Sequence, residues 1–61
     1  MRTEYTIKIT DTRGKIQYCT YAKSYVFDKF EDIKNRYFDC TVELFRVMYN
    51  GSSLYKADKI M

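Results

Sequence analysis

The chain has 61 residues, which is the size of one small domain. Its 46% content of hydrophobic residues excludes an intrinsically disordered chain, and its net charge of +3 is small for a protein that binds nucleic acid mainly by charge. Arg2 and Glu4 stand where the apolar core of a signal peptide would begin, and no apolar run approaches the ~20 residues of a membrane span. The sequence therefore predicts a cytoplasmic protein that does not enter a membrane.

Residues 4–21 predict a β-hairpin. The segment EYTIKIT, residues 4–10, alternates apolar and polar side chains as a half-buried strand does. Asp11 favours the first position of a turn, and Gly14 can adopt the left-handed conformation that closes it. A turn at this place can bring the apolar side chains of both strands to one face. The expected cross-strand pairs are Thr10–Lys15, Ile9–Ile16, Ile7–Tyr18 and Tyr5–Thr20.

An amphipathic helix is expected next. Four apolar residues at helical spacing form one stripe, namely Val26, Phe30, Ile33 and Tyr37. Two starts are open, because Ser24 can cap a helix from residue 25, whereas Asp28 and Glu31 can form a capping box for a shorter helix. Ser24 is the preferred cap, since the longer helix includes Val26 in the stripe.

The rest of the chain predicts a second hairpin. The segment CTVELFRVMY, residues 40–49, is the most apolar run and is rich in β-branched and aromatic residues. Asn50-Gly51 predicts a type I′ turn, and residues 52–60 predict a more polar strand. The element order ββαββ places the chain in the α+β class, with a four-stranded sheet and one helix on one face.

Two strand orders fit this element order. In a β-grasp the first and last strands are central and parallel, whereas in the order 2-1-3-4 every neighbouring pair is antiparallel. The last strand carries Lys56, Asp58 and Lys59, which suit an edge, so the sequence favours 2-1-3-4. This order separates Cys19 from Cys40 by about two strand spacings, too far for a disulfide, and predicts that both cysteines are reduced and partly buried.

The strand at residues 40–49 is apolar on both faces. Val42, Leu44 and Met48 point to one side of the sheet, and Phe45, Val47 and Tyr49 point to the other, where Leu54 joins them across the turn. A single helix covers one face only, and either set fits beneath it. The uncovered set predicts a surface for a partner or for a second copy, so a homodimer is expected.

The predicted helix also has surplus aromatic residues. Phe27 and Phe38 lie on the flank of the apolar stripe, close to Glu31 and Lys34. An apolar ridge edged by an acid is typical of a protein-binding surface. The sequence therefore predicts partner contacts at these four residues.

The sequence shows no sign of catalysis. It has no histidine to act as a base and no glycine-rich phosphate loop, and nothing near either cysteine activates its thiol. A zinc site would need two more suitable ligands than the two cysteines supply. We therefore expect a protein that is not an enzyme and holds no cofactor or metal.

An alternative function is nucleic-acid binding. The outward face of the first hairpin is expected to offer cations and one stacking ring, on Lys8, Lys15, Gln17 and Tyr21. Because the cations are few, we expect this binding to be weak and sensitive to salt.

Residues 11–33, DTRGKIQYCTYAKSYVFDKFEDI, resemble the small bacteriophage inhibitors of host uracil-DNA glycosylase. In that family an acidic turn ending in Gly-Lys precedes a Tyr-rich strand, a basic residue and a helix with a Phe-Glu pair. An apolar strand follows, as TVELF does at residues 41–45, and the likeness spans roughly residues 4–45. The matching residues are Asp11, Gly14, Lys15, Gln17, Tyr18, Tyr21, Lys23, Phe30 and Glu31.

The resemblance implies a phage-type homodimer that inhibits a host enzyme by mimicking DNA. Acidic side chains would stand in for phosphates, and an apolar pocket with its Phe would hold the side chain that the enzyme inserts into DNA. By this likeness Phe30 and Glu31 contact the partner. The helical stripe instead places Phe30 in the core, so the two lines of reasoning differ at this residue.

Overall fold

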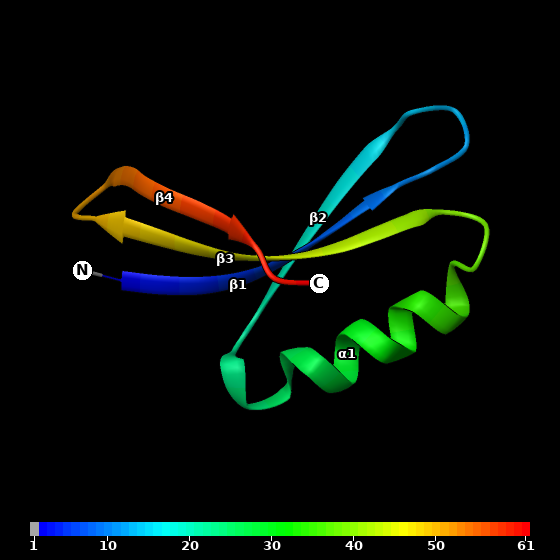
Figure 1. The fold of residues 1–61 in the computed structure, drawn as a ribbon, viewed down its shortest axis with the longest axis horizontal. Coiled ribbons are helices and arrows are strands. Elements are labelled where there is room, and N and C mark those ends of the chain that lie inside the picture. The colour runs from blue at the N-terminus through cyan, green and yellow to red at the C-terminus, as the bar shows by residue number, and fades with distance from the viewer. Residues whose placement is uncertain (1) are drawn as a thin grey trace.

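A computed structural model describes residues 2–61 and contains four strands and one helix (Figure 1). In chain order these are β1 (Arg2–Thr10), β2 (Ile16–Tyr21), α1 (Lys23–Arg36), β3 (Thr41–Asn50) and β4 (Ser53–Lys59). The strands form one sheet of order β2-β1-β3-β4 in which every neighbouring pair is antiparallel. The predicted α+β fold and strand order are confirmed, and the β-grasp is excluded because β1 pairs with β3.

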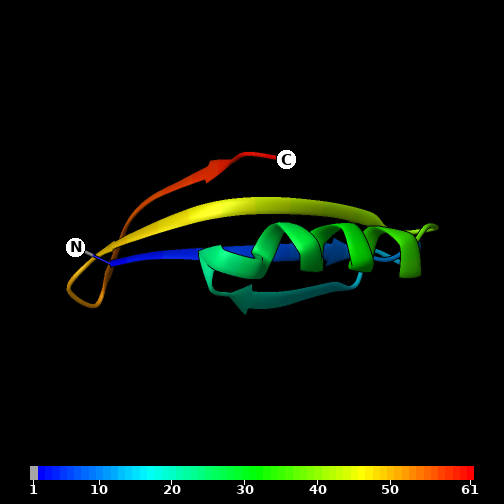
Figure 2. The same ribbon diagram turned by 90° about the horizontal axis from the view of Figure 1, so that it is seen from below.

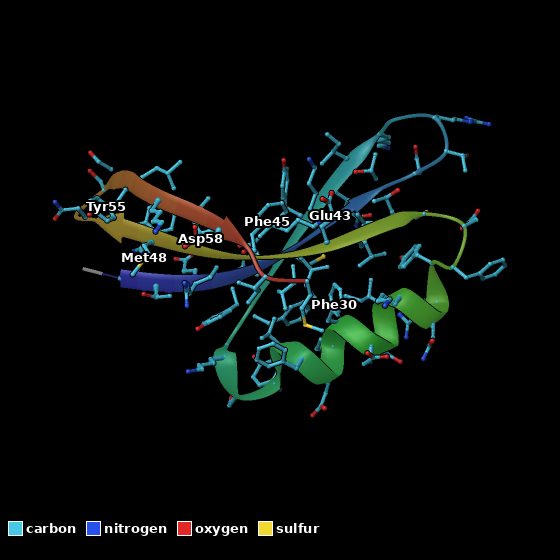
Figure 3. All side chains as sticks on the ribbon, viewed as in Figure 1. Phe30, Glu43, Phe45, Met48, Tyr55 and Asp58 are labelled. Atoms are coloured by element: carbon cyan, nitrogen blue, oxygen red, sulfur yellow. The ribbon has the colours of Figure 1, made fainter. Side chains whose placement is uncertain are left out.

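Helix α1 lies along one face of this twisted sheet (Figure 2), and since α1 is the one helix of the described residues, the opposite face has no helix over it. Side chains from three elements form the buried core, namely Ile7 and Ile9 of β1, Val26, Phe30 and Ile33 of α1, and Leu44 of β3. Among the described residues, β2 and β4 contribute none of these fully buried side chains. The structure thus selects the Val42 and Leu44 side of β3 as the face beneath the helix, while Met48 lies at the end of the sheet away from α1 (Figure 3).

The turn of the first hairpin is confirmed, but its register is wrong by one residue. The N–H of Gly14 donates to the carbonyl of Asp11 at 3.0 Å, and Gly14 has a φ of +84°. The N–H of Asp11 also donates to the carbonyl of Lys15 at 3.0 Å. Asp11 and Lys15 therefore form the last pair, and only three residues remain in the loop where four were expected.

This shift exchanges the two faces of β2. The observed pairs are Thr10–Ile16, Ile9–Gln17, Lys8–Tyr18, Ile7–Cys19, Thr6–Thr20 and Tyr5–Tyr21. Cys19 and Tyr21 share a face with the buried Ile7, whereas Ile16 and Tyr18 point to the side away from α1. Both cysteines are free and half-buried, as predicted.

Helix α1 begins earlier than either predicted cap allows. Its N-cap is Ala22, whose carbonyl accepts from the N–H of Val26 at 3.0 Å, and no side chain caps the end. Ala22 alone connects β2 to α1, so this short connection sets the start of the helix, and neither Ser24 nor Asp28 caps it. The apolar stripe is nevertheless confirmed, with Tyr37 packed against the core just after the last turn. No helix in residues 2–61 is long and apolar enough to span a bilayer.

The second hairpin turns one residue later than predicted. Asn50 pairs with Ser53, so Gly51 and residue 52 form the loop, and Gly51 has a φ of +66°. Because no other residue of this loop has a positive φ, the turn is of type II′ and not type I′. Further along β4, Tyr55 is the extra residue of a β-bulge, since Met48 pairs with Lys56 and Tyr49 pairs with Leu54.

Candidate functional site

We call the sheet face opposite α1 the open face. Its centre is a groove of about 550 Å³ that runs across all four strands. The side chains that line it are those of Thr6, Lys8, Tyr18, Thr20, Phe45, Val47, Tyr49, Leu54 and Ala57. The groove is lined by apolar and aromatic side chains from β2, β3 and β4.

The structure brings together all four residues of the predicted dimer or partner face. Phe45, Val47 and Tyr49 alternate along β3 on the open face, and the bulge in β4 places Leu54 directly opposite Tyr49. Leu54 is 63% exposed, so its side chain is available to a partner. The sequence predicted this set from the two-sided pattern of β3, with Leu54 added across the turn.

Tyr18 belongs to the same surface and was missed by the sequence analysis. It is also 63% exposed, and it lies opposite Lys8 at the β2 side of the groove. The expected register had turned Tyr18 toward the core. The signal that could have found it was the turn itself, because a type I turn that ends in a left-handed glycine normally leaves three residues in the loop.

Charges on the open face are largely paired within it. Lys59 Nζ lies 3.4 Å from Glu43 Oε2, and Arg2 Nε lies 3.0 Å from Glu4 Oε2. The guanidinium of Arg2 also stacks over the ring of Tyr49, 4.8 Å from its centroid. With Lys8 added, the face carries a net charge of about +1 around an apolar centre.

The aromatic ridge predicted on the helix is not continuous. Phe27 lies on α1 and is 44% exposed, but α1 ends at Arg36 and Phe38 follows in a turn, where it is 87% exposed. The helical spacing that grouped the two rings therefore does not apply to Phe38. Glu31 and Lys34 are exposed on α1.

Phe30 is not on a surface. It is 2% exposed and packs in the core, and the only charged group over its ring is Lys34 Nζ, 5.5 Å from the centroid, among the described residues. The helical stripe placed it correctly. A contact residue must be exposed, so the role that the resemblance implies for Phe30 is not available in this fold.

The predicted nucleic-acid face is divided between two sides of the sheet. Lys8 faces the open side, whereas Gln17 and Tyr21 face the side of α1. The ring of Tyr21 packs edge-on against Tyr25, with 6.0 Å between centroids, and desolvation raises the pKa of its phenol. Lys15 lies next to the hairpin turn. These four residues therefore do not form one basic, stacking surface.

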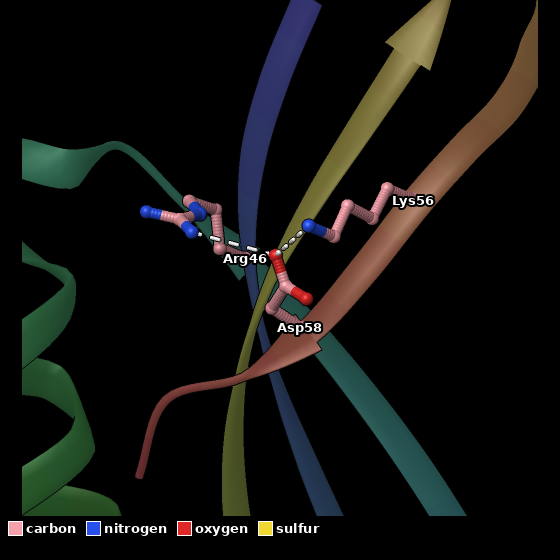
Figure 4. A network of polar contacts seen from close by, with 3 residues as sticks. All are labelled: Arg46, Lys56 and Asp58. Atoms are coloured by element: carbon pink, nitrogen blue, oxygen red, sulfur yellow. Dashed lines mark hydrogen bonds and ion pairs between the residues drawn. The ribbon is translucent and has the colours of Figure 1, made fainter.

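An ion-pair cluster lies on the α1 side of the sheet, beyond the end of the helix (Figure 4). Asp58 Oδ2 lies 3.4 Å from Arg46 Nη2 and 3.7 Å from Lys56 Nζ. Arg46 and Asp58 are cross-strand partners in β3 and β4. Asp58 thus offsets one of the two cations beside it, and its pair with Arg46 supports the observed register between β3 and β4.

The environment of Cys40 does not activate its thiol. Desolvation raises the pKa of the Cys40 thiol, and the nearby carboxylate of Asp39 raises it further. Cys40 Sγ donates a hydrogen bond to Asp39 Oδ1 at 3.6 Å, which also favours the protonated thiol. Cys40 lines a second groove of about 430 Å³, beside Tyr37 and the first hairpin turn. In residues 2–61 no cluster of three or more His, Cys, Asp or Glu side chains could hold a metal ion.

Comparisons with protein-family models, curated proteins and solved structures found no match to this chain.

Proposed function

We propose that this chain is a small, non-catalytic interaction protein of the phage type, which acts by binding and inhibiting a host protein. The uncovered apolar centre of the open face, around Phe45, Val47 and Leu54, supports an interaction protein, and the exposed Phe27 beside Glu31 on α1 supports the binding of a host protein. An exposed apolar groove rimmed by charged side chains is the usual form of a protein-binding surface. The unactivated Cys40 thiol supports a binding role over a catalytic one.

The first occupant of the open face is a second copy of the chain, which forms a homodimer. Because Lys59–Glu43 and Arg2–Glu4 pair their charges within each face, two open faces can meet with little repulsion. The face is three strands wide at most levels, four at the level of Phe45, and as long as β3, which gives roughly 14 Å by 33 Å or about 460 Å² in projection. Standard interfaces bury about 800 Å² per partner, so we expect a weak dimer in the micromolar range.

A dimer packed through its two sheets leaves both α1 helices on the outside. Each helix then presents Phe27, Glu31 and Lys34 to the solvent, on the layer farthest from the dimer interface. An exposed ring beside an acid can insert into a basic groove on a host protein, where the ring supplies desolvated contact and the acid guides the approach.

We expect Phe27→Ala to weaken host-protein binding by about 2 kcal/mol, which is a 30-fold loss, without changing the fold. Glu31→Lys should mainly slow association and alter its dependence on salt. The measurement is affinity capture from a bacterial lysate followed by binding kinetics with the captured protein.

Tyr55→Ala is the matched control for Phe27→Ala, because Tyr55 is an exposed ring on the bulge of β4, away from α1 (Figure 3). A captured protein that binds the Phe27→Ala and Tyr55→Ala variants equally well would show that the outer surface of α1 is not the contact.

The narrower proposal, from the resemblance, is that the host protein is uracil-DNA glycosylase. Glu31 keeps its implied contact role on exposed helix surface, but Phe30 cannot supply the apolar contact, so Phe27 takes that role. We expect this protein to suppress uracil excision by purified bacterial glycosylase at a modest molar excess. Unchanged excision at a large excess would remove this target and leave the general proposal of a host partner.

A further inference from the structure

β2 is an outer strand whose free edge is fully available. It pairs with β1 on one side, and no other strand in the described part of the chain pairs with its second side. In an antiparallel pair of strands, hydrogen-bonded residue pairs alternate with pairs that are not hydrogen-bonded. Asp11 and Lys15 are hydrogen-bonded, so every second residue from Lys15 onward bonds to β1. Ile16, Tyr18 and Thr20 therefore direct their backbone N–H and C=O groups outward.

The two outer strands of the sheet differ in how they are protected. β4 carries Lys56, Asp58 and Lys59 and is interrupted by the bulge at Tyr55, and both features discourage pairing with another strand. β2, with the sequence IQYCTY, has no charged residue, and its pairing with β1 is regular throughout. An unprotected edge of this kind is a template for one more strand.

Positive charge flanks the free edge of β2 at both ends. Arg13 and Lys15 precede the strand and Lys23 follows it, and none of these exposed cations belongs to an ion pair within residues 2–61. The acid nearest to Arg13 and Lys15 in sequence is Asp11, whose carboxylate accepts hydrogen bonds from the backbone N–H groups of both residues at 2.9 Å. The side-chain cations thus remain free to bind acids of a partner.

A second copy of the chain is a poor occupant of this edge. Two antiparallel registers would pair most of β2 with the β2 of another copy. In the first, Tyr18 lies opposite Tyr18, and the numbers of opposed residues sum to 36. In the second, Cys19 lies opposite Cys19, and the numbers sum to 38. Lys23 then lies at the level of Arg13 in the first register and of Lys15 in the second. Like charges would meet at both ends of the pair, which opposes this association.

We propose that the free edge of β2 binds an extended segment of another protein, uncharged in its centre and carrying Asp or Glu at both ends. The segment would join the sheet as a fifth strand next to β2. Main-chain hydrogen bonds to Ile16, Tyr18 and Thr20 would hold it, and its acids would pair with Arg13, Lys15 and Lys23. The backbone edge of β2 adjoins the open face, because the side chains of Tyr18 and Thr20 line its groove, but it is separate from the outer surface of α1.

The test uses fluorescently labelled peptides and the intact protein, with affinity measured by anisotropy. One probe alternates valine and threonine in its centre and has two acidic residues at each end, and the control probe has lysines at the ends. We expect the acidic probe to bind at least about 10-fold more tightly, with the difference shrinking as salt increases. Equal affinity for the two probes would overturn the proposal.

A matched pair of variants isolates the backbone contact. Tyr18→Pro removes one outward N–H and leaves the ladder to β1 intact, because proline is tolerated where an edge strand faces solvent. Tyr18→Thr removes the same ring but keeps the N–H and the preference for a strand. We expect at least a 10-fold loss of acidic-probe affinity in Tyr18→Pro relative to Tyr18→Thr, and equal affinity would contradict pairing at this edge.

A second measurement applies even where Tyr18→Pro does not fold. Two versions of the acidic probe are N-methylated at alternate residues, so that one blocks the hydrogen bonds toward β2 and the other blocks those on the far side. The native protein should lose affinity for one version only, and equal binding of both would contradict strand addition. A dimer of the free protein that Tyr18→Pro abolishes and Tyr18→Thr retains would assign the edge to a second copy and overturn the proposed occupant.

Discussion

Phe30→Ala is expected to destabilise the fold by ~3–5 kcal/mol. Phe30 is the largest side chain of the core cluster, and its truncation leaves a cavity between α1 and the two central strands. A domain of this size has a total stability of roughly 3–9 kcal/mol, so much of the variant should be unfolded at 37 °C. Urea unfolding followed by circular dichroism measures the loss.

Phe38→Ala is the control for this variant, because it removes the same ring from a position that is almost fully exposed. Its stability should stay within about 0.5 kcal/mol of the native protein. The opposite result for Phe30→Ala, a stable fold that no longer inhibits the host protein, would favour the contact role that the resemblance implies.

Val47→Glu is expected to abolish the homodimer and leave the monomer folded. Val47 lies in the middle of the open-face groove, between Phe45 and Tyr49 along β3, so the change would bury a carboxylate at the centre of the interface. We expect the dimer dissociation constant to rise at least 100-fold, which corresponds to about 2.7 kcal/mol. Sedimentation equilibrium over a range of concentrations gives this constant.

Thr3→Glu is the matched control for Val47→Glu. Thr3 is exposed on β1 at the same end of the sheet, but its cross-strand partner is Met48, so it lies on the opposite face from Val47. The control adds the same charge without entering the open face. A native protein that sediments as a monomer at tens of micromolar would remove the homodimer proposal altogether.

Most of the fold could be predicted because its determinants are local. The alternation in β1, the helical stripe of α1 and the polar character of β4 each follow from the spacing of a few residues. Together with the preference for apolar central strands, they were enough to select the strand order. Phe30 shows the strength of this reasoning, since its spacing alone placed it in the core.

The hydrophobic pattern alone could not predict the register of β2, because this strand carries apolar side chains on both faces. Ile16 and Tyr18 compete with Cys19 and Tyr21 for the side beneath α1, and hydrophobicity alone does not decide between them. The loop length decides, and one residue of loop exchanges the two faces. The same shift changed which residues form the candidate site. It brought Tyr18 to the open face and separated Gln17 and Tyr21 from Lys8.

The end of α1 was a second limit of sequence reasoning. Helical spacing grouped Phe38 with Phe27, but the helix stops at Arg36, where the N–H of Tyr37 donates to the carbonyl of Ile33 at 2.8 Å. No glycine or proline marks this end in the sequence, so the pattern gave no reason to stop there. Phe38 consequently occupies a turn, where its exposure could not be inferred from a helical wheel.

The distribution of the core over three elements gives the sheet two levels of local stability. Among the described residues, only α1, β1 and β3 contribute buried core side chains, and β2 adds the partly buried Tyr21, so we expect detachment of β2 or β4 to disturb the core less than loss of an inner element. Such partial opening is expected to cost less free energy than global unfolding. In a detached conformer the backbone of β1 or β3 becomes free to pair with a strand from another chain. We therefore expect α1, β1 and β3 to unfold together as one cooperative unit. Either outer strand could be replaced by a strand from another chain.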